Sequence, residues 1–303
     1  MLLHSAHTLQ NSLSDIFKRT LDALSTCAGE CRLCPRECGV DRYGNNTGYC
    51  GINSMRISAA NLHFGEEPPV SGSGGSGTVF FSGCSLKCAF CQNYPISHFL
   101  YGKDKSAGEL ANEFISLQEK GAHNINLVTP THISFLAFEA VREARARGLR
   151  IPLVYNTSGY EREEIIGHIL PVTDIFLFDV KYADNTLSSR FSGAEDYVEN
   201  NRASLERILK SGKKNRFAGG ILREGIIVRH LVLPSCIDNT IDVLNYLSGF
   251  KKQIYLSLMF QYFPANKAAE MPDIARKVSR EEYGKVLKHF ESLKFSKGWV
   301  QEL

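Results

Sequence analysis

The chain has 303 residues, of which 43% are hydrophobic, 22% charged and 10% aromatic, so it is long and apolar enough for about two domains, or for one large α/β barrel with a small extra module. This composition excludes a disordered, collagen-like or coiled-coil protein. Thirty-five Lys and Arg against 32 Asp and Glu give a formal net charge of +3, which does not indicate a nucleic-acid partner.

Nothing in the chain indicates insertion into a membrane or export. No window approaches about 18 uninterrupted apolar residues, as a transmembrane helix would need. The N-terminus also lacks the basic start and apolar core of a signal peptide. We therefore expect a cytoplasmic protein with no membrane partner.

The first elements in the chain are a helix and a cysteine-rich segment. Residues 7–26 are predicted to form an amphipathic helix, because apolar side chains recur near helical spacing. The cysteine-rich segment spans 27–51. The later stretch SGSGGSG, at 71–77, is either a flexible linker or a tight turn that leads into the apolar run beginning at Thr78.

From residue 78 onward, apolar runs of strand length alternate with helical patterns. The predicted strands are 78–82, 123–128, 151–155, 174–180, 225–233 and 254–259, and the predicted helices are about 106–121, 132–147, 160–169, 199–211, 238–248 and 280–293. These runs are typical of parallel strands that are buried on both faces. Six β–α units predict an α/β protein with a partial (β/α)6 barrel, open along one side, and place the chemistry on loops after the strands.

We expect two parts in this chain. Residues 1–70 would form a small helical, cysteine-rich metal-binding module, and residues 71–303 would form the partial barrel with its C-terminal tail. The only tryptophan, Trp299, is expected to pack this tail onto the barrel.

Eight of the nine cysteines lie between Cys27 and Cys91. An odd count without an export signal disfavours disulfides, and gaps of two and three residues favour thiolates that converge on metal. Cys84, Cys88 and Cys91 form C-x3-C-x2-C directly after the first predicted strand of the barrel. Three thiolates on a 4Fe–4S cluster leave one iron open, and the alternative is a zinc site completed by a distant histidine.

A second set of cysteines lies nearer the N-terminus. Cys31, Cys34, Cys38 and Cys50 form C-x2-C-x3-C-x11-C. Four thiolates with this spread can hold zinc or a second Fe–S cluster, and a third alternative is that they bind nothing stably. Cys27 lies one helical turn before Cys31 and is expected to be spare.

The stretch GSGTVFFSGCSLKCAFCQN resembles the signature of the radical S-adenosylmethionine (SAM) superfamily, with Phe90 as its aromatic residue. It is more specifically similar to the pyruvate formate-lyase activating enzymes. The stretches NTSGY at 156–160, TDIFLFDVKYAD at 173–184 and IIVRHLVLPSCIDN at 226–239 agree with this. The resemblance covers about residue 70 to the end, and the whole chain looks most like the activating-enzyme-like Fe–S proteins.

This resemblance implies an oxidoreductase that holds a 4Fe–4S cluster and binds SAM. A reductant such as flavodoxin or ferredoxin would supply an electron that cleaves SAM to methionine and a 5′-deoxyadenosyl radical, which abstracts hydrogen from a substrate. The implied substrate is a glycine in a partner enzyme. A peptide or small-molecule substrate, or a non-catalytic electron-transfer or binding protein, are the alternatives.

The resemblance also implies cofactor-binding residues. Asp179 and Lys181 match an Asp-x-Lys pair, in which Lys181 would neutralise the SAM carboxylate, and the alternative is a salt bridge at the barrel rim. Asn156 and Thr157 end the third predicted strand and could bind the ribose. Asn156 stands where activating enzymes often carry Asp, which puts a monovalent cation there in doubt.

Three further positions match the pattern of the superfamily less well. The superfamily usually carries Gly-Gly-Glu at the second strand, but residues 129–132 read Thr-Pro-Thr-His, from which Thr131 could offer a hydroxyl or a carbonyl. His230 is a candidate to face the cofactor, although strand alternation lets only one of His230 and Arg229 point inward. The alternative for His230 is an uninvolved core or rim histidine. Gln261 follows the sixth strand and could face substrate or adenine.

Two carboxylates, Glu66 and Glu67, precede the Gly-rich stretch. They could meet a basic substrate. Charged loop residues are more often solvated, and the sequence alone favours that interpretation.

Overall fold

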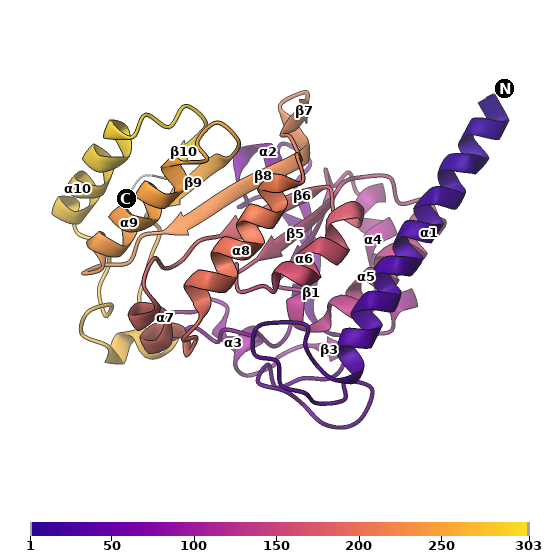
Figure 1. Ribbon diagram of the computed structural model, residues 1–303, viewed down its shortest axis with the longest axis horizontal. Coiled ribbons are helices and arrows are strands. Elements are labelled where there is room, and N and C mark those ends of the chain that lie inside the picture. The colour runs from indigo at the N-terminus through magenta and orange to yellow at the C-terminus, as the bar shows by residue number, and fades with distance from the viewer. Residues whose placement is uncertain (1, 302–303) are drawn as a thin grey trace.

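The computed structural model describes residues 2–301, with side chains described from Ser14 onward (Figure 1). Its strands are β1 (Arg56–His63), β2 (Ser76–Phe81), β3 (Lys103–Asp104), β4 (Ile125–Val128), β5 (Leu153–Thr157), β6 (Ile175–Asp179), β7 (Arg216–Ala218), β8 (Ile221–Leu231), β9 (Tyr255–Met259) and β10 (Gly298–Val300). Its α-helices are α1 (Leu2–Gly29), α2 (Pro68–Ser71), α3 (Tyr94–Ser97), α4 (Ala107–Glu119), α5 (Ser134–Ala146), α6 (Glu163–Ile169), α7 (Asn185–Ser192), α8 (Tyr197–Lys210), α9 (Ile237–Ser248) and α10 (Arg280–Ser292).

The strands form one open sheet in the order β10-β9-β8-β6-β5-β4-β2-β1-β3, with β7 paired to β8. The stretch from β2 to β9 is parallel at every step, and its strands follow one another in chain order. These are the six predicted strands, so the partial (β/α)6 barrel is confirmed. Since β3 and β10 end the sheet, the barrel is not closed.

The Gly-rich stretch at 71–77 is a tight turn and not a linker. The Gly75 N–H donates to the Ser71 carbonyl at 2.8 Å, and Gly77 already lies in β2, donating to the Asn124 carbonyl. Gly75 has a φ of +80°, a conformation that glycine adopts without strain.

The sequence did not predict the strands that extend the parallel core. β1 pairs antiparallel with β2, β3 pairs with β1, and β10 adds a parallel strand beside β9. β1 lies within the expected 1–70 module but shares the sheet of the barrel, so the division at residue 70 stays a prediction. Trp299 of β10 stacks on Tyr255 at 5.7 Å between ring centroids, which confirms that the tail packs onto the barrel.

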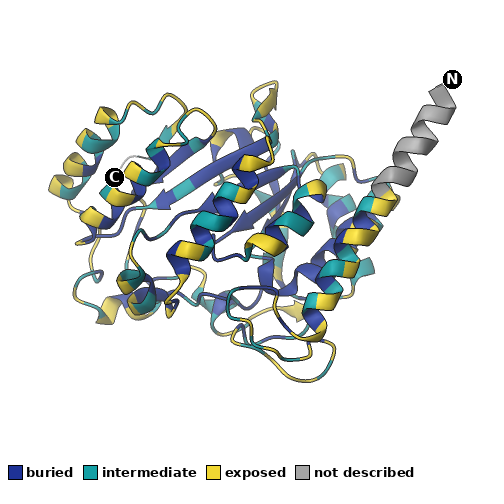
Figure 2. Cartoon of the chain, viewed as in Figure 1, coloured by how far each residue is buried: buried dark blue, intermediate teal, exposed yellow. Residues whose placement is uncertain are grey.

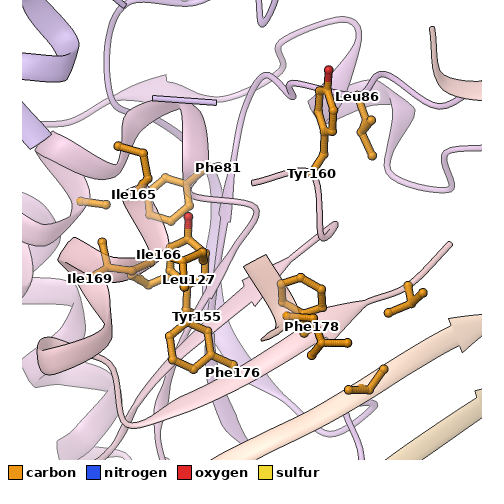
Figure 3. Close-up of a cluster of buried hydrophobic side chains, with 14 of the residues drawn as sticks. Phe81, Leu86, Leu127, Tyr155, Tyr160, Ile165, Ile166, Ile169, Phe176 and Phe178 are labelled. Atoms are coloured by element: carbon orange, nitrogen blue, oxygen red, sulfur yellow. The ribbon is translucent and has the colours of Figure 1, made fainter. Parts of the chain in front are cut away.

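The helices that follow the strands cover the outer face of the sheet, where most of the core lies (Figure 2). α4 begins at the predicted capping box of Ser106 and Glu109. On this outer face, Tyr155 of β5 stacks against Phe138 of α5, and its neighbours Phe176 and Ile166 belong to the same buried cluster (Figure 3). α1 packs beside α5 and α6.

The inner face of the sheet is apolar toward the start of its strands. Val154, Leu177 and Ile227 form a separate buried cluster there with Val70 of α2 and Leu222. Because side chains alternate along a strand, the residues two positions further on share this face. Asn156, Asp179 and Arg229 therefore point to the inside of the barrel at the carboxyl ends of β5, β6 and β8.

Among the described residues, no helix combines the length and the apolar character needed to cross a membrane.

Candidate active site

The loop after β2 carries three of the cysteines and is tightly packed. Gly83 has a φ of +87°, and a Cβ atom placed on it would lie 2.7 Å from Ile52 Cγ2 and 3.0 Å from the Cys50 carbonyl oxygen. Lys87 also adopts a positive φ, of +52°. Left-handed backbone at a non-glycine residue costs energy and is common in functional loops, so the path of this loop is set by its surroundings.

Each of the three loop sulfurs lies within hydrogen-bonding distance of a neighbouring group. The Leu86 N–H donates to Cys84 Sγ at 3.4 Å, the Ser192 hydroxyl donates to Cys88 Sγ at 3.0 Å, and Cys91 Sγ lies 3.2 Å from Ser97 Oγ. Phe90, between the last two cysteines, packs edge-on against Phe191 and Tyr262. The thiols of Cys91 and Cys88 are thus anchored to α3 and α7, and that of Cys84 is bonded within the loop.

Burial raises the pKa of the Cys88 thiol to about 12, and the Lys181 ammonium is the largest opposing influence. A thiolate at this position therefore needs more positive charge than Lys181 supplies, and a bound metal centre would provide it. Within the described part of the chain, no three Cys, His, Asp or Glu side chains already lie together as the ligands of an ion. The donor chemistry nevertheless suits an Fe–S cluster, since three thiols on one loop are the ligands that such clusters use.

A charged network stands on the inner face next to this loop. Lys181 Nζ lies 2.6 Å from Asp179 Oδ2, and Arg229 Nε lies 2.7 Å from Asp179 Oδ1. Arg229 Nη2 also donates to Asn156 Oδ1 at 2.5 Å. Burial alone would raise the pKa of Asp179, but Arg229 and Lys181 hold it below its ordinary value. Asp179 is therefore an anion flanked by two cations, and the structure brings together three predicted site residues, Asn156, Asp179 and Lys181.

Glu66 belongs to this network, although the sequence favoured a solvated loop residue. Its side chain is only 10% exposed; Asn126 Nδ2 donates to Glu66 Oε1 at 2.9 Å, and Arg229 Nη1 lies 3.4 Å from Oε2. Burial raises the pKa of Glu66, while Arg229 opposes this. The segment before α2 thus brings a carboxylate into the barrel.

Arg229, rather than His230, faces the inside. Successive side chains alternate between faces, and Arg229 lies level with Asp179 in the register of β6 and β8. His230 points to the outer face, where Nδ1 donates to the Val180 carbonyl and Nε2 accepts from Thr240 Oγ1. Burial lowers the pKa of His230 to about 4, so it is a neutral core histidine, and the expectation that it faces the cofactor is wrong.

Thr131 and Thr157 likewise turn away from the inner face. Both hydroxyls donate to Glu161 Oε1, the first at 2.5 Å, and the Tyr155 hydroxyl lies 3.4 Å from both carboxyl oxygens. Strand alternation puts Thr157 opposite to Asn156 in direction, which is why both could not face one cofactor. The four residues form a buried hub between the ends of β4 and β5, which we call the Glu161 hub.

The loop that replaces Gly-Gly-Glu braces the cysteine loop. Thr129 has a φ of +53°, and His132 is 2% exposed with Nε2 donating to the Ser82 carbonyl at 2.8 Å. Burial lowers the pKa of His132 to about 4. This histidine is therefore neutral and holds the residue from which the cysteine loop departs.

Gln261 is exposed directly after β9, and its backbone carbonyl accepts a hydrogen bond from Gln92 Nε2 at 3.5 Å. It therefore lies beside the cysteine loop, and its role toward a ligand stays a prediction. Tyr262 is buried, and its hydroxyl donates to the Ile274 carbonyl.

The N-terminal cysteine segment lies against this site. Cys31, Cys34 and Cys50 are 5–6% exposed. Arg36 Nε donates to the Ser85 carbonyl at 2.9 Å, and Arg42 Nη2 donates to the His132 carbonyl at 3.2 Å. Sequence reasoning missed both arginines, because nothing in their local pattern signals partners so far along the chain.

Comparison with known proteins identifies the class. The family model of the radical SAM superfamily matches residues 78–232. An uncharacterized protein of Methanocaldococcus jannaschii is 31% identical over 269 residues, covering 85% of this chain and 73% of its own length. The pyruvate formate-lyase-activating enzyme of Clostridium pasteurianum is 23% identical over 178 residues, covering 56% of this chain and 67% of its own.

Two solved structures are similar at low identity. A domain of pyruvate-formate lyase-activating enzyme from Bacteroides vulgatus is 13% identical with a TM-score of 0.35, covering 53% of this chain and 86% of that one. Histidine-tagged anSMEcpe with bound AdoMet is 14% identical with a TM-score of 0.46, covering 70% of this chain and 55% of that one.

The fold and the three-cysteine loop are those of a radical SAM enzyme, in which a 4Fe–4S cluster and SAM do the chemistry. The chain belongs to the radical SAM superfamily and resembles its activating enzymes.

Proposed function

We propose that this enzyme holds a 4Fe–4S cluster on Cys84, Cys88 and Cys91, cleaves SAM reductively, and generates a glycyl radical in a partner protein. When bound, the cluster supplies an open iron for the amino and carboxylate groups of SAM and the electron that splits its sulfonium into methionine and a 5′-deoxyadenosyl radical. The protein itself binds and orients SAM and the substrate, and it excludes water from the reaction site.

The observation that carries this proposal is the position of Lys181. Its ammonium is bonded to Asp179 at 2.6 Å and is close enough to Cys88 that the two influence each other's pKa. A SAM molecule at Cys88 would therefore bring its carboxylate to a partly buried cation, where the pairing is stronger than in water. Asp179, which is itself bonded by Arg229, holds this cation on the inner face, where the Lys181 side chain is 18% exposed.

Other contacts suit a closed reaction site. Phe90 of the cysteine loop packs against Phe191 and Tyr262. Arg229 holds the Asn156 amide on the inner face, where we propose that it meets a ribose hydroxyl. Thr131, Thr157 and His230 are engaged on the outer face, so we leave them out of the proposed cofactor contacts.

The likeness to the activating enzyme of Clostridium pasteurianum supports a protein substrate. Phe99 and Tyr101, which follow the cysteine loop, are 59% and 64% exposed, and Phe263 after β9 is 46% exposed. Exposed aromatic side chains beside a reaction site are typical of surfaces that dock another protein. Flavodoxin or ferredoxin in the cytoplasm remains the reductant and location that we predict.

The experiment uses full-length protein purified without oxygen, reconstituted with iron and sulfide, reduced with dithionite and mixed with SAM. We expect 5′-deoxyadenosine from the wild type and from Cys236→Ala, which loses a buried thiol outside the site, but none from Cys88→Ala. Equal product from all three would contradict the cluster assignment. No product from a wild type whose cluster is reduced would instead favour electron transfer.

The substrate is tested separately with purified pyruvate formate-lyase as the probe. We expect a glycyl radical signal by electron paramagnetic resonance (EPR) only when wild-type enzyme, reductant and SAM are all present. Formation of 5′-deoxyadenosine without that signal would overturn the glycyl-radical assignment for this probe and leave the cleavage reaction standing.

A further inference from the structure

Arg42 is a buried cation that lacks a carboxylate partner. Its side chain belongs to a residue only 2% exposed; Nη1 donates to Cys50 Sγ at 3.0 Å and Nη2 to the His132 carbonyl at 3.2 Å, while Nε is buried without a partner. Among the ion pairs between described residues, none within 4.0 Å includes Arg42. Arginine stays protonated in proteins, and a buried charge without compensation is strongly unfavourable.

Two of the four sulfurs accept a hydrogen bond from an N–H group. Arg42 donates to Cys50 Sγ at 3.0 Å, and the Tyr49 backbone N–H donates to Cys38 Sγ at 3.3 Å. Hydrogen bonds of this kind stabilise charged thiolates and orient metal ligands. This segment thus has four cysteines, N–H donors to two of their sulfurs, and a buried guanidinium that forms no ion pair with another described residue.

We propose that Cys31, Cys34, Cys38 and Cys50 bind a thiolate-ligated metal centre, and that Arg42 is its counter-charge and its link to the SAM site. Four thiolates around a divalent ion, or around an Fe–S cluster, carry a net negative charge, which is what the buried guanidinium lacks. The centre is either a zinc ion or an auxiliary Fe–S cluster, and in both cases cysteine sulfur binds the metal.

The link runs through short contacts. Arg42 bonds the carbonyl of His132, and the His132 ring bonds the carbonyl of Ser82, which precedes Gly83 in the cysteine loop. Gly83 itself lies so close to the Cys50 carbonyl and Ile52 that a side chain at this position would clash with both.

A second connection starts at Arg36, which bonds the carbonyls of Ser85 and Ser192. The Ser192 hydroxyl in turn donates to Cys88 Sγ. The N-terminal centre is therefore linked to the cysteine loop at Ser82, Gly83 and Ser85, and through Ser192 to Cys88, so its occupancy positions the proposed cluster. This role of the centre, unlike its existence, rests on the proposed cluster at Cys84, Cys88 and Cys91.

The metal itself is tested by analysis of the full-length chain after loading with Zn²⁺ alone, or with iron and sulfide. We expect Cys34→Ser and Cys38→Ser to lose one centre that Cys27→Ser retains, because Cys27 lies outside the set. If these two variants lose zinc, the centre is a zinc ion. If they lose iron and sulfide, the centre is an Fe–S cluster. Equal metal in all three variants would overturn the proposal, while the cleavage assay with Cys88→Ala would be unaffected.

The charge role of Arg42 is tested by a double-mutant cycle in thermal unfolding of the metal-loaded protein. Arg42→Met should lower Tm in the wild type, where it leaves the anionic centre without a counter-charge. In the Cys34→Ser background it should lower Tm less or raise it, since the centre is gone. The matched control is Arg32→Met, an exposed arginine of the same segment that bonds Glu30. Equal shifts of Tm in both backgrounds would contradict the charge role.

The link to the SAM site is tested with Arg42→Lys, which keeps the charge but cannot bond Cys50 and His132 together. We expect it to retain metal yet to bind SAM about tenfold more weakly, with a smaller SAM-induced change in the EPR signal of the reduced cluster. Arg32→Lys should match the wild type. If Arg42→Met lost its metal and still bound SAM as the wild type does, the link would be refuted.

Discussion

Glu161 is a buried carboxyl group in the outer-face core, and its ionisation can be tested through the pH dependence of protein stability. The residue is fully buried, and Thr131, Thr157 and Tyr155 all direct hydroxyls at it. Burial raises its pKa from an ordinary 4.5 to about 7, and the three hydroxyls oppose this only partly. The folded protein therefore binds a proton at Glu161 more tightly than the unfolded chain does.

The sign of the pH effect follows from this difference. Between pH 4.5 and 7 the folded state holds the proton while the unfolded state has lost it, so stability falls as pH rises and levels off above about 7. At 1.36 kcal/mol for each pH unit, the loss of unfolding free energy between pH 5 and pH 8 is about 2.5 kcal/mol. Glu161→Gln keeps an acceptor for the two threonines and cannot ionise.

We therefore expect the unfolding free energy of Glu161→Gln to gain about 2.5 kcal/mol relative to the wild type when the pH is raised from 5 to 8. The assay is urea unfolding of the metal-free, reduced chain at both pH values. Glu163→Gln, at an exposed position on α6, is the matched control and should show no such change. If the difference between Glu161→Gln and the wild type were the same at pH 5 and pH 8, the reasoning would be refuted.

Two further substitutions test the inner face and the cysteine loop. Lys181→Ala should weaken SAM binding about 10- to 100-fold, as expected for a lost charge-assisted hydrogen bond, and unchanged affinity in a SAM titration would exclude the carboxylate role. Gly83→Ala should lose more stability and cluster iron than Gly121→Ala. Both glycines have a positive φ, but only Gly83 would place its Cβ against Ile52 and the Cys50 carbonyl, and equal effects would mean that packing there is unimportant.

The parallel core and the cysteine loop were predictable because their signals are local. A parallel strand is buried on both faces and reads as a continuous apolar run, as in residues 174–180, and the C-x3-C-x2-C spacing lies within eight residues of one loop. The edge strands gave no such signal. β1 has a single buried residue among partly and fully exposed ones, and β10 is only three residues long, so sheet pairing rather than sequence pattern determines them.

The polar groups of the barrel were harder to predict, because their partners are distant in sequence. Glu66 and Arg229 are 163 residues apart, and nothing near Glu66 distinguishes it from a solvated loop residue. Alternation did predict that only one of Arg229 and His230 faces inward, but not which one. The register with β6 decides that, since Arg229 lies opposite Asp179.

The loop after β4 lacks the Gly-Gly-Glu motif, but its residues still have structural roles. Thr131 bonds the Glu161 hub and His132 braces Ser82, so both side chains serve packing between loops and neither faces the inside of the barrel. The inner face of β4 nevertheless carries a carboxylate, because Glu66 is bonded to Asn126 of that strand. A residue that precedes the barrel thus supplies the negative charge that the sequence of the second parallel strand lacks. The paired charge of Arg229, 3.4 Å from Glu66, offsets part of the free-energy cost of burying this carboxylate.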